Sequence, residues 1–196
     1  MVLKIVQVGD PVLRKPARAL THQEIVSAET KKLIRDMRET MYEAPGVGLA
    51  APQVGLSLQL AVIEDSEDNL DEVPPEDLAE KQRSVVPFHV IINPVITHLA
   101  EEQADFYEGC LSLAGFSAVV PRARSIRVEC FDERGKRQVI DASGWYARIL
   151  QHEIDHLHGT IYIDRMRSRT FTSVDNWRQY SKGQPIPPDS SASKKK

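Results

Sequence analysis

The chain has 196 residues, of which 41% are hydrophobic, and a formal net charge of −3. This length suits one domain that buries its own core, and the small negative charge gives no general electrostatic reason to bind nucleic acid or an anionic membrane. Two cysteines are too few for a disulfide framework. No apolar run approaches a membrane span and no transit peptide is visible, so we expect a soluble protein that binds neither nucleic acid nor membrane.

The N-terminal part of the chain predicts two strands with a helix between them. Residues 4–8 have the pattern of a short strand, and the apolar run 58–63 predicts another. Residues 21–24 match a capping box, and Pro45 ends the helix. The helix itself is predicted from apolar residues at helical spacing, which are Leu33, Ile34, Met37 and Met41.

The middle of the chain begins with an acidic segment that contains several prolines. We expect residues 64–87 to form an exposed insertion that carries at most one short helix, at residues 76–83. Strands are then predicted at residues 89–92 and 95–99, joined by a turn at Asn93-Pro94.

The C-terminal part predicts a hairpin followed by the strongest helix of the chain. The loop at residues 132–135 follows an alternating apolar pattern and indicates antiparallel pairing. A helix is expected over residues 143–158, closed by Gly159. Residues 160–163 suggest one more strand, and the proline-, serine- and lysine-rich residues 181–196 suggest a disordered tail.

This helix carries the pentapeptide His-Glu-Ile-Asp-His, which starts at His152. Histidines four positions apart lie above one another on one helix face, so His152 and His156 can bind the same metal ion. Glu153 is rotated by about a third of a turn, where its carboxylate can contact a metal-bound water without ligating the metal. The spacing indicates a metal-dependent hydrolase. The alternative is an amphipathic helix with two exposed histidines.

A catalytic site of this type usually has three protein ligands, so the third ligand identifies the reaction class. The metzincin peptidases place a histidine where this chain has Tyr162. Thermolysin-like peptidases use a later glutamate, and no glutamate follows Glu153. Asp164 and Asp175 remain as downstream oxygen donors, without a recognisable ligand motif around them.

Upstream of the helix, Cys110 follows a glycine that permits a tight turn, and such a turn can direct its thiolate at a metal. Cys130 lies in an alternating strand and is expected to be a small buried hydrophobe.

The glycine-rich residues 46–55 lack the lysine of a phosphate loop. They are either a tight connection from helix to strand or a segment that pairs with an extended substrate, with Gln53 as a hydrogen-bond donor.

Three segments taken together resemble the ordered motifs of the peptide deformylases. They are Gly-Val-Gly-Leu-Ala-Ala-Pro-Gln at residues 46–53, Glu-Gly-Cys-Leu-Ser at 108–112 and Gln-His-Glu-Ile-Asp-His-Leu-His-Gly at 151–159. The resemblance extends from residue 9 to about residue 175. Residues 142–150 and 168–171 are similar to the organellar branch of animals and plants, which implies a protein of the mitochondrial matrix.

The resemblance implies one α+β domain over residues 1–180, with antiparallel β-sheets around the metal-bearing helix and the N-terminal helix packed outside. One divalent ion is expected, Fe²⁺ or Zn²⁺, with Co²⁺ or Ni²⁺ as plausible substitutes. The implied ligands are Cys110, His152 and His156. Metal-bound water would attack the formyl carbon with Glu153 as general base and then general acid, while the Gln53 amide and the Leu111 backbone N–H bind the oxyanion.

The implied substrates are N-formylmethionyl nascent chains near the ribosome exit, which the enzyme would convert to formate and a free N-terminus. An apolar pocket must then hold the methionine side chain, and the Arg148 guanidinium would have to leave that pocket while its stem lines the wall. The residues assigned to substrate binding are Val47, Gly48, Phe106, Glu108, Gly109, Trp145, Arg148 and Ile149. The oligomeric state is open between monomer and homodimer.

Two alternatives stay open. A zincin-like metallopeptidase would cleave internal peptide bonds and take its third ligand downstream of His156. A non-catalytic metal- or peptide-binding module would use the same pocket without turnover. The insertion at residues 64–87 is either a solvated loop or a contact for a partner.

Overall fold

The computed structural model describes residues 1–71 and 73–187. The strands are β1 (Gly48–Ala50), β2 (Leu60–Asp65), β3 (Val86–Leu99), β4 (Gln103–Cys110), β5 (Leu113–Ala123), β6 (Ser125–Phe131), β7 (Arg137–Ser143) and β8 (Thr172–Ser173). The helices are α1 (His22–Ile25), α2 (Ala28–Glu43), α3 (Glu67–Asp71), α4 (Pro75–Lys81), α5 (Gly144–Leu157) and α6 (Val174–Asn176). A π-helix at Trp177–Ser181 follows α6.

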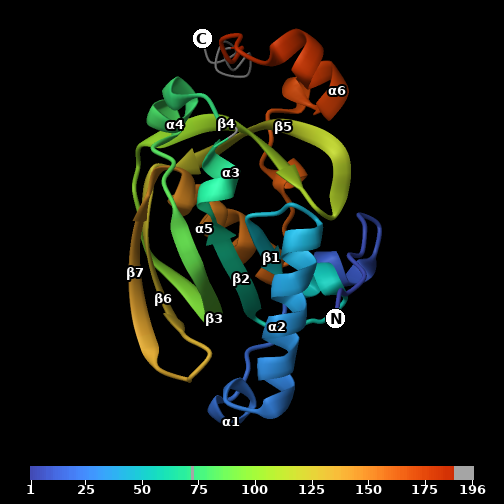
Figure 1. The fold of residues 1–196 in the computed structure, drawn as a ribbon, viewed down its shortest axis with the longest axis vertical. Helices are drawn as coiled ribbons and strands as arrows, with labels where there is room; N and C mark the ends of the chain where they lie inside the picture. Colours follow the sequence, from blue (N-terminus) through green and yellow to red (C-terminus); the bar gives the residue numbers. More distant parts are fainter. Residues whose placement is uncertain (72, 188–196) are drawn as a thin grey trace, which may run out of the picture.

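Two antiparallel sheets surround helix α5, and α2 packs outside them (Figure 1). The larger sheet has the order β1-β2-β3-β6-β7, and the smaller has the order β4-β5-β8. Every pairing within them is antiparallel. This arrangement confirms the expected α+β class, with the histidine-bearing helix inside and the N-terminal helix outside.

Strand β2 of the larger sheet is buried on both faces. Its side chains alternate, so Leu60 and Val62 pack toward α2 while Ala61 and Ile63 pack toward α5. All four side chains are fully buried. A strand covered on both faces is apolar at consecutive positions, and this explains the continuous apolar run in the sequence.

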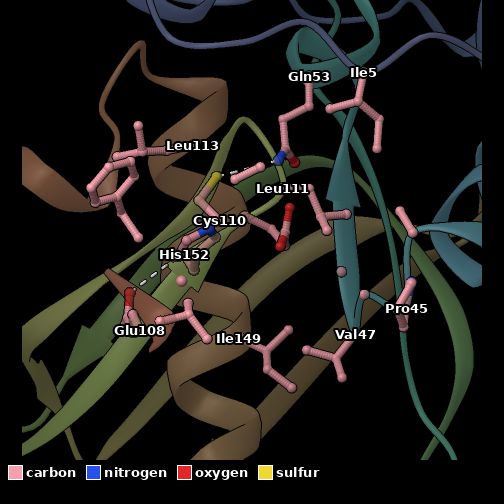
Figure 2. A pocket seen from close by; sticks show the side chains of 18 of the residues that line it. Ile5, Pro45, Val47, Gln53, Glu108, Cys110, Leu111, Leu113, Ile149 and His152 are labelled. Atoms are coloured by element: carbon pink, nitrogen blue, oxygen red, sulfur yellow. Dashed lines mark hydrogen bonds and ion pairs between the residues drawn. The ribbon is translucent and has the colours of Figure 1, made fainter. Parts of the chain in front are cut away.

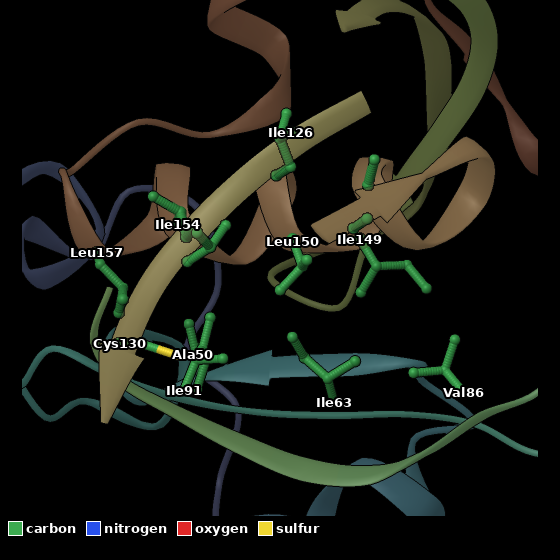
Figure 3. Packing of buried hydrophobic residues seen from close by; sticks show 14 of the residues in the cluster. Ala50, Ile63, Val86, Ile91, Ile126, Cys130, Ile149, Leu150, Ile154 and Leu157 are labelled. Atoms are coloured by element: carbon green, nitrogen blue, oxygen red, sulfur yellow. The ribbon is translucent and has the colours of Figure 1, made fainter. Parts of the chain in front are cut away.

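Helix α5 is fixed by an apolar cluster on its side facing the larger sheet. Leu150, Ile154 and Leu157 point from α5 toward Ile63 of β2 and Ile91 of β3 (Figure 3). Leu150 and Leu157 are fully buried. Because this face is anchored in the core, the remaining faces of α5 carry the histidines toward the smaller sheet.

Several expected elements are confirmed. Helix α5 begins after Ser143, and Gly159 follows its C-terminus with a φ of +74°. Strands β6 and β7 form the expected hairpin. The capping box at Thr21 and Glu24 is present, but it caps the short helix α1, and Ser27 caps α2 separately.

Residues 4–8 do not form the expected strand. The backbone N–H of Val6 donates to the carbonyl of Gln53 at 2.9 Å, and that of Val8 donates to the carbonyl of Ser112 at 2.7 Å. These two acceptors belong to different segments, so no ladder forms. The N-terminal segment instead bridges the glycine-rich stretch and the connection between β4 and β5.

Two other expectations are corrected. Asn93-Pro94 is no turn, because β3 is continuous through it, and Asn93 has a φ of +50°. The Asn93 side chain bonds both the N–H and the carbonyl of Leu20, at 2.9 and 2.8 Å, and its backbone N–H donates to the carbonyl of Gln59 at 2.9 Å. Residues 160–163 are also not a strand, and a 3₁₀ turn at Tyr162–Asp164 occupies their place.

In its described residues, the acidic segment at 64–87 carries two short helices, α3 and α4, where at most one was expected. Its ends belong to strands β2 and β3, which pair directly through Asp65 and Val86. The expected tail lies mostly outside the described residues, which end at 187. Within the residues that the structure describes, none of the helices combines the length and apolar character that a membrane crossing needs.

Candidate metal centre

The thiol and the two imidazoles that the sequence singled out lie together. Cys110 ends β4, where the pairing with β5 shifts register after Gly109 and the chain turns back toward Leu113. This turn places the Cys110 Sγ 3.2 Å from Nε2 of His156. One ligand atom from each of Cys110, His152 and His156 lies within 4.8 Å of the others. Figure 2 shows Cys110 and His152 facing each other beside the cavity.

These three side chains suit one divalent metal ion. A sulfur and two imidazole nitrogens form a donor set that Zn²⁺ and Fe²⁺ accept, and three protein ligands leave a coordination position open. His156 is almost completely buried, with 1% of its surface exposed, so solvent cannot satisfy its ring. The site therefore fits the metal that the sequence implied.

Glu153 lies beside this cluster with a carboxylate that is free to act as a base. Burial raises its pKa from the ordinary value of a glutamate to about 7. Among the described residues, no side chain or backbone group bonds its Oε2. Gly48 of β1 lies directly against this carboxylate, where the Cβ of any other residue would overlap it. A buried carboxyl that titrates near neutrality can both accept and donate a proton at neutral pH.

The Gln53 side chain is oriented by the backbone around it. Its Oε1 accepts a hydrogen bond from the N–H of Ala50 at 2.8 Å. This bond fixes the amide plane, so Nε2 must point the other way, and it lies 3.5 Å from the Cys110 Sγ. Gln53 is buried, and it therefore presents a fixed N–H donor to the metal site.

Glu108, which was expected to contact substrate, is held in a buried network of ion pairs. Arg122 donates to both of its oxygens at 3.0 Å, and Arg148 donates to Oε1 at 2.6 Å. His152 Nδ1 lies 3.1 Å from Oε2. Burial alone would raise the pKa of Glu108, but the bond to His152 and the charge of Arg122 hold it well below its usual range. An ionised Glu108 orients His152 so that Nε2 faces the metal site.

Arg122 and Asp155 belong to this network and were missed from the sequence. Arg122 of β5 donates to Asp155 as well as to Glu108, and Asp155 also accepts two bonds of 2.7 Å from Arg165. Arg122 thereby ties α5 to strands β4 and β5 of the smaller sheet. Asp155 was visible inside the pentapeptide, but nothing in the sequence indicated its partner 33 residues away.

A half-open cavity of about 600 Å³ adjoins the cluster. Most of the residues expected to bind substrate border it, namely Val47, Gly48, Glu108, Gly109, Trp145, Arg148 and Ile149. The sequence did not indicate other residues on its wall, which include Ile5, Gln7, Pro45, Tyr107, Leu113 and Phe116. Figure 2 shows Ile5, Pro45, Val47, Leu113 and Ile149 around this space. Its predominantly apolar lining suits an uncharged side chain.

Phe106, the remaining residue expected to bind substrate, lies behind this wall. Its ring packs edge-on against Trp145, with 6.4 Å between the ring centroids. It borders a separate, much smaller cavity together with Arg148. Leu111, expected to bind the oxyanion, lies in the turn after Cys110, where its carbonyl accepts a hydrogen bond of 2.9 Å from Gln7.

The fold and the site define an α+β protein with a Cys-His-His cluster at one side of an apolar cavity. The model of the polypeptide deformylase family matches residues 2–172, and the chain belongs to this family. Peptide deformylase 1A, chloroplastic/mitochondrial, of Arabidopsis thaliana is 46% identical over 173 residues, which cover 88% of this chain and 64% of that protein. The chain therefore spans less than two thirds of this plant relative.

A bacterial relative is matched over more of its length. Peptide deformylase 1 of Bifidobacterium longum is 48% identical over 187 residues, which cover 95% of this chain and 82% of that protein. Among solved structures, a class I type b peptide deformylase from Acinetobacter baumannii with Met-Ala-Ser bound superposes with a TM-score of 0.75 and 29% identity. That match covers 85% of this chain and 99% of the other.

Proposed function

We propose that the protein is a metal-dependent hydrolase that removes the formyl group from N-formylmethionyl peptides. The observation that carries this proposal is the buried carboxylate of Glu153, which lines the same apolar cavity as Cys110 and His152. Within the residues that the structure describes, its Oε2 has no hydrogen-bond partner. Membership of the polypeptide deformylase family supports the proposal. So does the Met-Ala-Ser peptide bound by the Acinetobacter baumannii relative.

Cys110, His152 and His156 would hold the divalent ion, which when bound lowers the pKa of water and polarises a carbonyl oxygen. Glu153 accepts a proton from the water that attacks the formyl carbon. The carbonyl oxygen gains negative charge as the new C–O bond forms. The Gln53 Nε2–H and the Leu111 backbone N–H donate to this oxygen.

The second half of the reaction uses the same carboxyl group. Glu153 gives its proton to the departing amine nitrogen, the C–N bond breaks, and the formyl carbon leaves as formate. One water molecule is consumed and no oxidant or reductant is needed. A carboxyl with a pKa of about 7 suits this double role, because both of its protonation states are populated at neutral pH.

The finer features of the substrate and location belong to the same proposal. The cavity would hold the methionine side chain, and the rest of a nascent chain would leave through its open side. Fe²⁺ or Zn²⁺ would be the native ion. The proposed location in the mitochondrial matrix is supported by the organellar Arabidopsis relative, whereas the Bifidobacterium relative is bacterial. Imaging of the tagged full-length protein in its source cells tests that location.

The geometry argues against the peptidase alternative. A zincin-like site needs a ligand downstream of His156, and Asp164 is engaged elsewhere, because it pairs with Arg14 and accepts the Ile161 N–H at 2.9 Å. The Asp175 side chain is 94% exposed. The upstream sulfur of Cys110 would supply the third donor in their place, since it lies within 4.8 Å of a ring nitrogen of each histidine.

Release of formate from formyl-Met-Ala-Ser tests the proposal, with cleavage of an unformylated peptide as the comparison. We expect formate and no internal cleavage. Peptidase activity that persists with bound metal in Cys110→Ser would support the zincin alternative.

Glu153→Ala separates an enzyme from a non-catalytic binding module. Loss of the general base and acid should lower deformylation by a factor of about 10² to 10⁴ while metal binding is retained. Unchanged turnover in this variant would refute the role of Glu153.

A further inference from the structure

Arg148 is more buried and makes more hydrogen bonds than a residue that only lines the cavity would need. Only 3% of its surface is exposed. Its Nη1 donates to Glu108 Oε1 at 2.6 Å and to the carbonyl of Val120 at 2.8 Å, and its Nη2 donates to the carbonyl of Ala104 at 2.6 Å. One guanidinium on α5 therefore bonds both β4 and β5.

Two aromatic rings hold the same guanidinium from its sides. Its central carbon lies 5.2 Å from the centroid of Phe106 and 5.8 Å from that of Trp145. Both distances fall within the range of cation–π attraction. The fork of Arg148 is thus fixed in position before any ligand binds.

The two oxygens of Glu108 have different hydrogen-bond partners, and this difference indicates the role of Arg148. Oε1 accepts from Arg122 Nε and from Arg148, whereas Oε2 accepts from Arg122 Nη2 and contacts His152 Nδ1. Arg148 and His152 therefore hold opposite oxygens of one carboxylate. The plane of that carboxylate sets the direction of the His152 ring.

We propose that Arg148 is a positioning residue, which holds the Glu108 carboxylate and through it keeps the His152 ring oriented for metal binding. This inference rests on the metal site of the proposed function. Without Arg148, Oε1 of Glu108 would keep only the bond from Arg122. Arg122 also donates to Asp155, so it does not hold Glu108 alone. The buried charged residues of this network are Arg122, Arg148, Glu108 and Asp155. Loss of Arg148 would leave one cation for two anions among them. Glu108 would then be free to turn, and His152 with it.

Metal affinity measures this role directly. Purified wild-type protein and Arg148→Met are stripped of metal and titrated with Co²⁺, whose absorption reports the geometry of its ligands. We expect Arg148→Met to bind Co²⁺ at least about tenfold more weakly, as is usual when an outer partner of a metal ligand is lost. Arg127→Met is the matched control, because Arg127 makes a bidentate pair with Asp141 on the exposed surface.

Arg148→Lys keeps the charge but cannot reproduce the fork, so we expect it to recover only part of the affinity. Arg148→Lys should also shift the NMR resonance of the His152 Nδ1 proton in the metal-bound protein. If Arg148→Met does not fold, the Co²⁺ affinity and this resonance in Arg148→Lys test the proposal. Wild-type Co²⁺ affinity together with an unchanged resonance would overturn the proposal.

A side chain that only lined the substrate cavity would give a different pattern. Arg148→Met would then alter KM for formylated peptides and leave Co²⁺ affinity unchanged, which contradicts a positioning role. We expect the reverse, with kcat and metal affinity reduced and KM nearly constant. Wild-type protein that binds Co²⁺ but releases no formate would contradict the proposed function and leave this comparison of affinities valid.

Discussion

Gly48 shows how little space separates the backbone of β1 from the carboxylate of Glu153. A Cβ at position 48 would overlap that carboxylate. A Cβ at position 46 would come closest to a terminal carbon of Leu111, at 2.8 Å, and would be in ordinary contact with the Gly48 carbonyl oxygen at 3.5 Å. The two glycines of the same stretch therefore have different roles, since Gly48 leaves room for the Glu153 carboxylate and Gly46 leaves room for the flexible Leu111 side chain.

Gly48→Ala should displace Glu153 and lower kcat for deformylation by a factor of about 10², which is typical when a catalytic group moves by about 1 Å. Gly46→Ala is the matched comparison, and its loss should be much smaller because a side-chain end can shift. Steady-state kinetics on both variants, with circular dichroism to verify folding, measure the effect. A folded Gly48→Ala protein with wild-type kcat would contradict the tight fit.

Among the elements, the insertion that carries α3 and α4 is anchored to the larger sheet by one buried ion pair. Arg83 donates to Asp65 through Nε at 2.7 Å and through Nη2 at 2.9 Å. The Asp65 side chain is 0% exposed, and that of Arg83 is 13% exposed. Gln82, next to Arg83, also packs against Gly144 at the start of α5.

Arg83→Met should lower the free energy of unfolding by about 3–5 kcal/mol, because it leaves the buried Asp65 charge without its partner. The double variant Asp65→Leu with Arg83→Met should recover most of this loss. Urea denaturation measures both. Equal stability of Arg83→Met and the wild type would show that the pair does not anchor the insertion.

Strand β3 carries a histidine that links pH to stability. His89 contacts the carbonyl of Pro87 and the hydroxyl of Tyr146 on α5, each at 2.9 Å. Burial lowers its pKa below the ordinary value, more than the bond to Pro87 raises it. The unfolded chain therefore binds a proton more readily than the folded chain as pH falls below about 6.5.

Wild-type protein should consequently lose stability as pH falls from about 6.5 toward the folded pKa of His89. His89→Gln should lack this part of the loss. Denaturation curves at several pH values between about 7.5 and 5 measure the difference, with His98→Gln on the exposed end of β3 as the control. The same pH dependence in His89→Gln and wild type would contradict the assignment.

At the scale of the molecule, local sequence patterns and the resemblance to a family were enough to predict several residues of the candidate site. The spacing of His152 and His156 fixed their common helix face, because helical geometry is local. Cys110 was found through its glycine and the absence of a ligand downstream of His156. Gln53 was identified by the motif around it.

The parts that failed depend on tertiary contacts. Residues 4–8 look like a strand, but their backbone bonds two separate segments. Arg122 meets Glu108 because β4 pairs with β5, and Arg148 meets it because α5 packs against these strands. The periodicity of the sequence indicates neither contact. Asn93 looks like a turn residue, and only the fold shows that its side chain satisfies the backbone of Leu20.

We propose that one divalent ion, held by Cys110, His152 and His156, is required for deformylation. The most direct measurement is the rate of formate release from formyl-Met-Ala-Ser by metal-free protein as Fe²⁺ is added anaerobically. We expect negligible activity without metal, a linear rise and saturation at one equivalent per chain. Full activity in the metal-free protein, or saturation only at two equivalents, would contradict a single Cys-His-His metal centre.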